Sequence, residues 1–565
     1  MSALWLPLVP GVPLLMLLAL GYPAWRNRVV AMVPWAALPG LLVAVWLPSG
    51  VVLPLPGAPW QAALGLDEVG RGLLLVSAVV WGLSGWFARG WLHGDGRAAL
   101  FMAFWLAAMA GQLGLLLARD LPTFYLFFAL MGFAAYGLVV HEGSWVARRA
   151  GRLYLAMLMV GEVCLFAGVA LVASRAEDLL FPGLGGEWTA SAMALLLFAT
   201  GFGIKAGVLG LHGWLPVAHP AAPVPASAVL SGLLIKAGLV GWWRVLPPEP
   251  ATVVPGGVAE LVMFMGIAAA LYGALAGLWQ VRAKTVLAFS SVSQMGWLTL
   301  LAGVALRHPG EGTALAVLLL FVGQHALAKA ALFLGVGLLG RVSAVRRGTV
   351  WWGLWLPALA LAGAPLTGGF LAKESLSALL RAGGDYSTVA PWLLLASLLS
   401  TLLMGRLLWM TWPRRSSGAD KPTSDAGHVA GLWLPWFGMV VLAAIGPWLW
   451  LTFGGFLPGV GYTAPVARQT GAVLEGLVVL LIGGAAVGIL IRHPLGRLVE
   501  GGRHWRLVIR VGRRRWERRL RHWWRRGQTQ SLRRERQLQD WPVVGRGLML
   551  LAVVLWLGLL VEGGV

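Results

Sequence analysis

Apolar stretches of about 20 residues recur along nearly the whole chain. A bilayer core roughly 30 Å thick needs about that many helical residues to cross it. Backbone groups left unpaired in hydrocarbon are costly, so helices are the default spanning structure. A transmembrane barrel would instead alternate in segments of about 10 residues. The sequence therefore predicts an all-α polytopic membrane protein.

Composition agrees with this prediction. The 565 residues are 58% hydrophobic and only 12% charged, whereas soluble proteins carry about 25% charged residues. The single cysteine, Cys164, lies in a predicted span, which excludes an intrachain disulfide and a Cys-based zinc or iron–sulfur site. Since the chain also lacks a Gly-rich phosphate loop, we predict no cofactor, no metal and no catalytic redox residue. Any redox cofactor would belong to another subunit.

Charge clusters and Pro/Gly breaks divide the chain into about sixteen spans. The first apolar run, Leu4 to Leu20, lacks a basic leader, and Gly21-Tyr22-Pro23 is a poor cleavage site, so we predict a retained helix. The spans begin near residues 4, 29, 69, 98, 121, 153, 189, 224, 257, 284, 313, 350, 390, 430, 471 and 545.

Basic residues alternate between the predicted loops. Loops after odd-numbered spans hold the Lys and Arg residues, and loops after even-numbered spans hold acids such as Asp67-Glu68. Cytoplasmic loops carry the basic excess. This pattern predicts an even number of spans with both termini on the outer side of a bacterial inner (cytoplasmic) membrane. The basic residues are Arg26, Arg28, Arg89, Arg97, Arg148, Arg149, Arg152, Arg282, Lys284, Arg341, Arg346, Arg347, Arg414, Arg415 and Lys421.

The segment from Arg503 to Asp540 is arginine-dense and includes Trp505, Trp516 and Trp523. Basic residues near anionic headgroups contribute about 1 kcal/mol each, and Trp favours the membrane interface. We predict a basic lateral helix on the cytoplasmic surface, at 500–541, that contacts lipid and precedes a last span at 542–565. Nucleic-acid binding is the alternative for such a stretch, but its position between two spans argues against it.

Five cations lie inside predicted spans, where a charge is costly and marks a functional candidate. They are Lys205, Lys236, His325, Lys329 and Lys373. The alternative, structural ion pairs or snorkelling side chains, fits one such residue better than five in successive central spans. Burial disfavours the charged form of a lysine and a nearby carboxylate restores it, so moving a carboxylate can load or release a proton.

Helix-breaking residues surround two of these lysines. Gly203 and Gly207 flank Lys205, whereas Pro365, Gly368 and Gly369 precede Lys373. Interrupted spans in corresponding positions of two halves indicate inverted repeats, although Gly and Pro are common in membrane helices generally. We predict two inverted five-helix repeats with broken helices. The predicted domains are N-terminal helices at 1–97, a core at 98–412 with repeats at 98–246 and 257–412, additional helices at 413–499, and the two C-terminal segments above.

Four motifs resemble one known family. The run from Leu211 to Pro223, continued by Ser231-Gly232 and Lys236, is similar to the signature of the antiporter-type subunits of respiratory complex I, Mrp cation/proton antiporters and membrane-bound hydrogenases. Further matches are Lys284 to Gly296, His325 to Phe333 and Gly363 to Lys373, and the resemblance covers roughly residues 67–412. It implies a proton-translocating subunit of a complex I-like assembly, with other membrane subunits as partners and no nucleic acid.

The resemblance also implies roles for individual residues. Lys205 matches the pumping lysine of the family, Lys236 a connecting lysine, and His325 with Lys329 the link toward a second channel. Lys373 matches the residue that closes the outlet side. The predicted proton pathway also includes His212 and His219 of the signature run, and Glu374.

One position departs from the family pattern. The family usually has a glutamate on the fifth helix after two aromatic residues, but Ala129 follows Phe127-Phe128 here. Glu162 lies deep in the next apolar run. We hypothesise that Glu162 replaces the missing carboxylate and pairs with Lys205. The alternative is that Glu162 faces a partner subunit and that this half is a degenerate channel.

Two other functions stay open at this point. A multisubunit Na⁺/H⁺ antiporter subunit would show sodium-dependent transport, and the residues do not decide between H⁺ and Na⁺. The membrane subunit of an energy-coupled inorganic carbon uptake complex is the second alternative, although a different pattern is expected there around Ser231-Gly232 and Lys236. A purely structural anchor would not explain five intramembrane cations.

Overall fold

The computed structural model describes residues 2–56, 60–176, 178–181, 191–245, 257–308, 312–413, 426–453 and 470–492. Residues 1–485 form one compact unit, and residues 486–565 form a second. The predicted lateral helix at 500–541 and the predicted last span at 542–565 lie outside the described residues.

The N-terminal part contains helices and one small hairpin. Its two strands, β1 (Val52–Pro54) and β2 (Ala63–Gly65), pair antiparallel with Leu53 opposite Leu64. This hairpin is a minor exception to the predicted all-α fold. The helices are the 3₁₀ turns Ser2–Trp5 and Val33–Ala37, α1 (Leu8–Ala19), α2 (Arg26–Met32), α3 (Leu38–Trp46) and α4 (Glu68–Trp91).

The central part contains the helices of the two predicted repeats. The first set is α5 (Ala98–Leu117), α6 (Leu121–Val140), α7 (Trp145–Ala173), α8 (Ala192–Ala206), α9 (Leu215–Ala221), α10 (Val224–Val229), a π-helical turn at Leu230–Leu234 and α11 (Lys236–Val245). The second set is α12 (Val258–Leu278), α13 (Ala283–Arg307), α14 (Gly312–Leu339), α15 (Ala344–Gly353), α16 (Trp355–Ala362), α17 (Gly368–Ala382) and α18 (Tyr386–Met410). Two further helices follow, α19 (Ala426–Phe453) and α20 (Thr470–Arg492).

Twelve helical segments among the described residues are long and apolar enough to cross a bilayer. The apolar segments Met193–Ala206 and Val473–Gly488 are shorter. The polytopic all-α class is therefore confirmed, whereas the count of sixteen spans stays a prediction.

Short polar side chains define where several helices begin. Asp67 caps α4 by accepting from the Gly70 amide at 2.7 Å, and Asp120 caps α6 by accepting from the Thr123 amide at 2.8 Å. Ser144 caps α7 in the same way, through the Ala147 amide at 3.1 Å. Such caps satisfy amide groups that a helix leaves unpaired at its first turn. They fix the ends of helices whose interiors are almost uniformly apolar.

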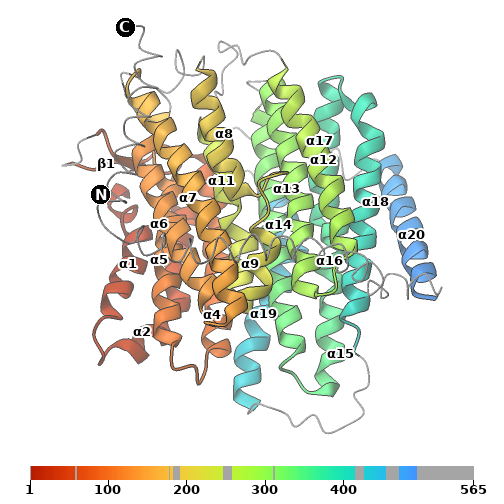
Figure 1. The fold of residues 1–565 in the computed structure, drawn as a ribbon, viewed down its shortest axis with the longest axis horizontal. Helices are drawn as coiled ribbons and strands as arrows, with labels where there is room; N and C mark the ends of the chain where they lie inside the picture. Colours follow the sequence, from red (N-terminus) through yellow and green to blue (C-terminus); the bar gives the residue numbers. More distant parts are fainter. Residues whose placement is uncertain are drawn as a thin grey trace, which may run out of the picture. The chain divides into compact units, whose positions relative to one another are not determined.

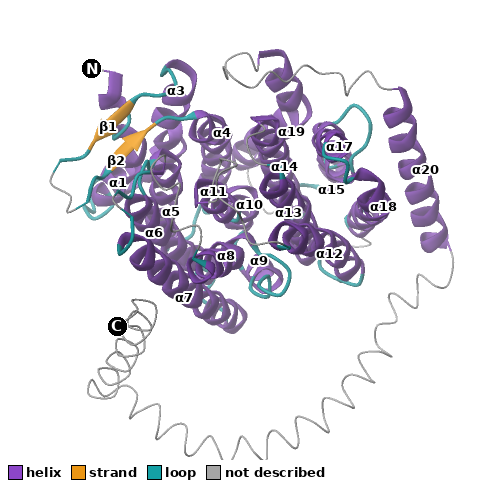
Figure 2. Cartoon of the chain, turned by 90° about the horizontal axis from the view of Figure 1, so that it is seen from above, coloured by secondary structure: helices purple, strands orange, loops and turns teal. Residues whose placement is uncertain are grey.

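The helices that carry central cations are the most enclosed. Within the segments Val224–Val245 and Thr313–Leu339, the most apolar stretch of 18 residues is wholly buried. The corresponding stretch of Ala283–Arg307 is 94% buried. In Figure 1, α5 to α8 lie on one side and α12 to α18 on the other. Figure 2 shows α10, α11 and α14 inside the bundle. Lys236, His325 and Lys329 therefore lie on helices that are enclosed by other helices.

Candidate functional site

The first broken helix ends at Gly207. This residue has a left-handed backbone with φ of 71°, and its amide donates to the Ile204 carbonyl at 3.2 Å while the Val208 amide donates to Gly203 at 3.1 Å. These two bonds form a Schellman motif, which ends α8 before the chain restarts as α9. The predicted break at Gly207 lies where the helix ends, whereas Gly203 lies inside α8 and supplies the carbonyl that closes the motif.

The second broken helix ends in the same way at Gly363. Its φ is 88°, and the amides of Gly363 and Ala364 donate to Ala360 at 3.2 Å and to Leu359 at 3.0 Å. Pro365 lies in the connection, and the predicted breakers Gly368 and Gly369 begin α17. A Cβ atom on Gly369 would collide with the Ala360 carbonyl, so α16 and α17 approach closely there. Sequence analysis had not assigned Gly363 to the break.

Lys205 lies in the last turn of α8 and is 3% exposed. Its ammonium donates to the Tyr154 hydroxyl at 3.3 Å and stands 5.7 Å from the centre of the Phe128 ring. Tyr154 donates in turn to the Gly132 carbonyl at 2.9 Å. An aromatic ring face and a hydroxyl both stabilise a buried cation. Lys205 is thus held between α6, α7 and α8.

Glu162 of α7 is 4% exposed, and neither carboxylate oxygen has a hydrogen-bond partner in the described part of the chain. One oxygen lies 3.3 Å from the position that a Cβ on Gly132 would take. Glu162 and Lys205 line one cavity of about 10 Å³, together with Tyr154 and Trp214. The two groups share this cavity without a hydrogen bond between them, and the predicted pairing stays a prediction. The cavity is close to the roughly 10–15 Å³ that one water needs.

Lys236 and Lys329 are connected by hydrogen bonds through two serines. Lys236 donates at 2.5 Å to the Ser231 carbonyl, which belongs to the π-helical turn. The Ser231 and Ser291 hydroxyls are 2.8 Å apart, and Ser291 donates to the Leu287 carbonyl at 3.2 Å. Lys329 donates to the same carbonyl at 2.6 Å. The chain of contacts therefore runs from α11 across α13 to α14, in the buried centre of the unit.

Ser290 gives Lys329 a second partner, because the ammonium also donates to its hydroxyl. Lys236 is 4% exposed and Lys329 is fully buried. Both ammonium groups therefore rely on these carbonyl and hydroxyl partners rather than on water.

The predicted histidines occupy different surroundings. His325 and His219 are fully buried, and none of their ring nitrogens has a hydrogen-bond partner among the described residues. His219 instead stacks on Phe333, with ring centres 4.9 Å apart. His212 lies in the connection after α8, where Nε2 is 3.4 Å from the Tyr272 hydroxyl.

Lys373 of α17 lies at the second break. Its ammonium donates to the Ala362 carbonyl at 2.9 Å and stands 5.0 Å from the centre of the Trp297 ring. The neighbouring Glu374 accepts from Arg381 of the same helix at 2.7 Å. Lys373 therefore faces the break, whereas Glu374 forms an ion pair along α17.

Several of these contacts were not predicted from the sequence. Tyr154 was given no role, although Tyr154 and Glu162 are eight residues apart and share one face of α7. That spacing was the available signal. The other contacts around the lysines could not be predicted in this way, because only helix packing brings these side chains to the lysines. They are made by Ser231, Ser290, Ser291 and Trp297. No group of three or more metal-ligating residues occurs within the described ranges.

Comparison with known proteins identifies the family. The family model for NADH:quinone oxidoreductase/Mrp antiporter transmembrane proteins matches residues 118–403, which is just over half of the chain. The chain belongs to this antiporter family. The match covers both broken helices and every cation described above.

Related proteins agree with this membership. Hydrogenase-4 component B of Escherichia coli (strain K12) is 35% identical over 43% of this chain and 38% of its own length. The chain thus spans well under half of that relative. NADH-quinone oxidoreductase subunit N of Desulforudis audaxviator is 29% identical over 76% of this chain and 87% of its own length.

A solved structure shares the fold. In the Mrp complex from Dietzia sp. DQ12-45-1b, one chain superposes with a TM-score of 0.69 at 21% identity, covering 90% of this chain and 60% of that one. The shared fold therefore extends over 90% of this chain, beyond the residues that the family model matches.

Proposed function

We propose that this antiporter-family protein moves protons through a mid-membrane chain of lysines, histidines and serines, as a subunit of a complex I-like assembly. The hydrogen-bonded link from Lys236 to Lys329 through Ser231 and Ser291 carries the proposal. The two lysines donate to main-chain carbonyls, which accept but do not pass on a proton, whereas the Ser231 and Ser291 hydroxyls can do both. The link therefore positions two proton-carrying amines and one relay pair of hydroxyls across three buried helices.

Repulsion between the charged forms of Lys236 and Lys329 couples proton binding at one lysine to proton release at the other. A proton that arrives at one lysine disfavours the charge on the other and promotes its release. His325 lies one helical turn before Lys329, on the same face of α14, and receives the protons that Lys329 releases. Lys373, at the second break, is the last carrier before the outlet.

Glu162 modulates Lys205 in the first half of this pathway. Its carboxylate lines the same small cavity as the ammonium, which has room for about one bridging water. An ionised Glu162 stabilises the Lys205 ammonium, and a protonated one favours proton release toward Lys236. This assignment gives Glu162 the role of the glutamate that the family carries where Ala129 stands here.

The two halves support an inverted-repeat architecture. Each set contains one broken helix, α8–α9 in the first and α16–α17 in the second, and the same glycine motif ends both first segments. We retain about sixteen spans, the domain limits 1–97, 98–412, 413–499, 500–541 and 542–565, the lateral helix and outward-facing termini as proposals. The basic helices α2 and α15 both lie at the lower end in Figure 1, as the predicted orientation requires.

The partners proposed are other membrane subunits, since the relatives named above are components or subunits of larger enzymes. A Na⁺/H⁺ antiporter subunit is the second candidate, because the Mrp complex shares the fold over 90% of this chain. Only the Na⁺/H⁺ antiporter subunit would require sodium for proton movement.

Membrane vesicles that contain the tagged chain with its natural partners test the function. Proton uptake is followed with a pH-sensitive dye in wild type, Lys329→Met, and the exposed control Arg28→Gln. We expect Lys329→Met to abolish uptake and Arg28→Gln to leave it unchanged. Unchanged uptake by Lys329→Met would overturn the proposal, and loss of uptake on sodium removal would establish the antiporter alternative. Redox subunits that copurify with the tag would identify the driving reaction.

A further inference from the structure

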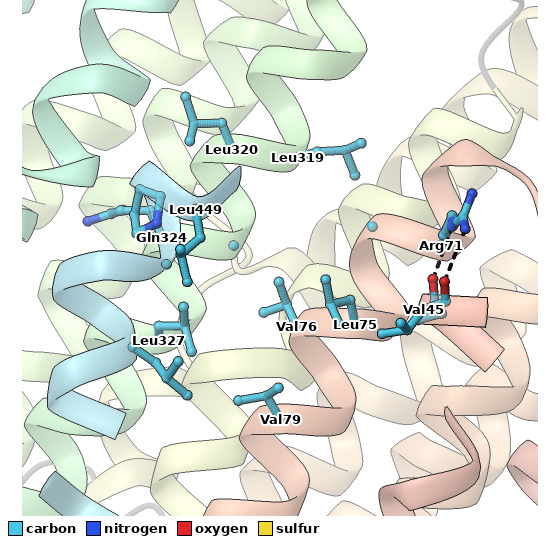
Figure 3. A pocket seen from close by; sticks show the side chains of 16 residues that line it. Val45, Arg71, Leu75, Val76, Val79, Leu319, Leu320, Gln324, Leu327 and Leu449 are labelled. Carbon is cyan, nitrogen blue, oxygen red and sulfur yellow. Dashed lines mark hydrogen bonds between the residues drawn. The ribbon is translucent and has the colours of Figure 1, made fainter. Parts of the chain in front are cut away.

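A second cavity lies outside the proton pathway, between α3, α4, α14 and α19. Its volume is about 380 Å³, within the range of about 300–1,000 Å³ that is typical of ligand sites. Figure 3 shows Leu75, Val76 and Val79 of α4 facing Leu319, Leu320 and Leu327 of α14. Water would find few of the two to four polar partners that it needs among these side chains. The lining therefore selects an apolar occupant.

The cavity opens at the surface of the unit. Val45 of α3 and Leu449 of α19 both line it and are each 44% exposed, whereas Gln324 of α14, which also lines it, is 2% exposed. It therefore runs inward from an apolar surface of the membrane-spanning helices.

One end of the cavity carries a cation. Arg71 lies in the first turn of α4, where its side chain donates to the carbonyls of Ala44 at 3.0 Å and Val45 at 3.5 Å (Figure 3). The lining continues along α4 from Arg71 to Val79, about 12 Å at 1.5 Å per residue. One leaflet of hydrocarbon is about 15 Å thick. The site is thus long enough for much of an acyl chain. Its cation lies at the end of a span, at the depth of the lipid headgroups.

We infer that this cavity binds one phospholipid with an anionic headgroup, its phosphate at Arg71 and an acyl chain between α4 and α14. The Arg71 guanidinium attracts an anionic phosphate through its positive charge, while its N–H groups also contact the carbonyls of Ala44 and Val45 and the Ser49 hydroxyl. The deep end of the cavity reaches Gln324, whose amide nitrogen lies 3.0 Å from where a Cβ on Gly369 would stand. The bound chain therefore braces the wall behind the second helix break. The inference is independent of the ion that the protein moves.

A cavity-filling variant tests the acyl-chain site. At Gly323 an added Cβ would meet only Val76, at 3.4 Å, so a larger side chain can extend into the cavity without displacing backbone. The full chain with its copurifying subunits is extracted in mild detergent, and retained lipids are quantified by mass spectrometry. We expect Gly323→Leu to retain at least about five-fold less phosphatidylglycerol than wild type. The matched control, Gly484→Leu, places a leucine where no atom lies within 4 Å and retains the wild-type amount.

The headgroup and the identity of the occupant have their own tests. Arg71→Gln should keep a bound lipid but lose the preference for phosphatidylglycerol over phosphatidylethanolamine. A photoreactive side chain at Leu449 should gain the mass of a lipid on illumination. Equal lipid retention by Gly323→Leu and wild type, no headgroup preference in wild type, or a crosslink from Leu449 to polypeptide would each overturn the inference.

Discussion

Lys373 donates a hydrogen bond of 2.9 Å to the main-chain carbonyl of Ala362, across the break in its own transmembrane segment. Ala362 is the last residue of α16, and the end of a helix at which carbonyls are unpaired carries partial negative charge. Lys205 occupies the comparable end of α8, but from inside the helix. Both breaks therefore place an ammonium at a helix C-terminus. Lys205 precedes its break in the sequence, and Lys373 follows its break.

Replacement of Lys373 should stop proton movement without unfolding the protein. Lys373→Met removes the titratable group and leaves an apolar side chain of similar length beside Trp297. Lys373→Arg keeps the charge but does not release its proton. We expect both variants to lose dye-detected uptake while they retain the wild-type elution volume in detergent. Wild-type uptake by Lys373→Met would show that the outlet lies elsewhere.

The left-handed glycine at the second break should be intolerant of a side chain. Gly363 has a φ of 88°, and an added Cβ would stand 3.0 Å from Lys373 Cδ. Gly363→Ala should therefore cost about 1–2 kcal/mol and also displace the lysine. A lowered melting temperature with reduced uptake is expected. Gly348→Ala is the control, since nothing lies within 4 Å of its added Cβ.

The breaks show what sequence could predict. Glycine and proline mark positions where a helix ends, so Gly207 and the segment from Pro365 to Gly369 were recognisable from residue type alone. Gly203 was assigned to the break because glycine weakens a helix, yet its carbonyl is what the Schellman motif requires. Gly363 was overlooked because one glycine in an apolar run carries no special signal until its φ is known.

Glu162 should prove essential for coupling in the first half. Glu162→Gln keeps the shape of the side chain but removes the charge that favours the Lys205 ammonium, so uptake should fall sharply while the protein stays folded. Adding Ala129→Glu should restore part of it, because Ala129 lies one turn before Gly132, which accepts from Tyr154 and would place an added Cβ 3.3 Å from a Glu162 oxygen. Near-normal uptake in the single variant would favour the alternative that Glu162 faces a partner.

The serine pair should behave as one unit. Ser231→Ala and Ser291→Ala each break the hydroxyl contact between the π-helical turn and α13, so each should slow uptake by at least about tenfold, as for loss of a proton-transfer group. The double variant should be no slower than either single variant, because the first substitution already removes the contact between the two hydroxyls. Additive losses would mean that the two hydroxyls act separately.

This pair also marks the limit of prediction from sequence. Buried lysines stand out in a chain with 12% charged residues, because a charge in an apolar span is rare. Serines are not rare in spans, and only the register of the π-helical turn against α13 brings these two to 2.8 Å. The cations could therefore be found from sequence, and the groups that connect them could not.

A cluster outside the membrane spans should make stability depend on pH. Asp67 is contacted by Arg244, from the end of α11, and by Arg119 at 2.5 Å. Burial raises the pKa of Asp67, but the two arginine charges and the Gly70 amide outweigh it and hold the pKa below the ordinary value. A carboxyl with a lowered pKa stabilises the folded state above its unfolded-state pKa of about 3.9, and this contribution is lost as the pH falls through the lower folded value.

Asp67→Asn should therefore be destabilised at neutral pH. Removing one partner of a part-buried ion pair costs about 2 kcal/mol, between the values for exposed and buried pairs. The melting temperature in detergent should therefore drop by a nearly constant amount between pH 8 and 5. Below about pH 4 the difference from wild type should shrink, because the wild-type carboxyl begins to be protonated as well. Glu260→Gln provides the control: its pair with Arg307 is exposed, and such pairs contribute less than about 1 kcal/mol. A difference that stays constant into acid would mean that the loss does not come from the carboxylate charge. No difference at any pH would mean that Asp67 acts through its helix cap alone, since an asparagine side chain can also accept from the Gly70 amide.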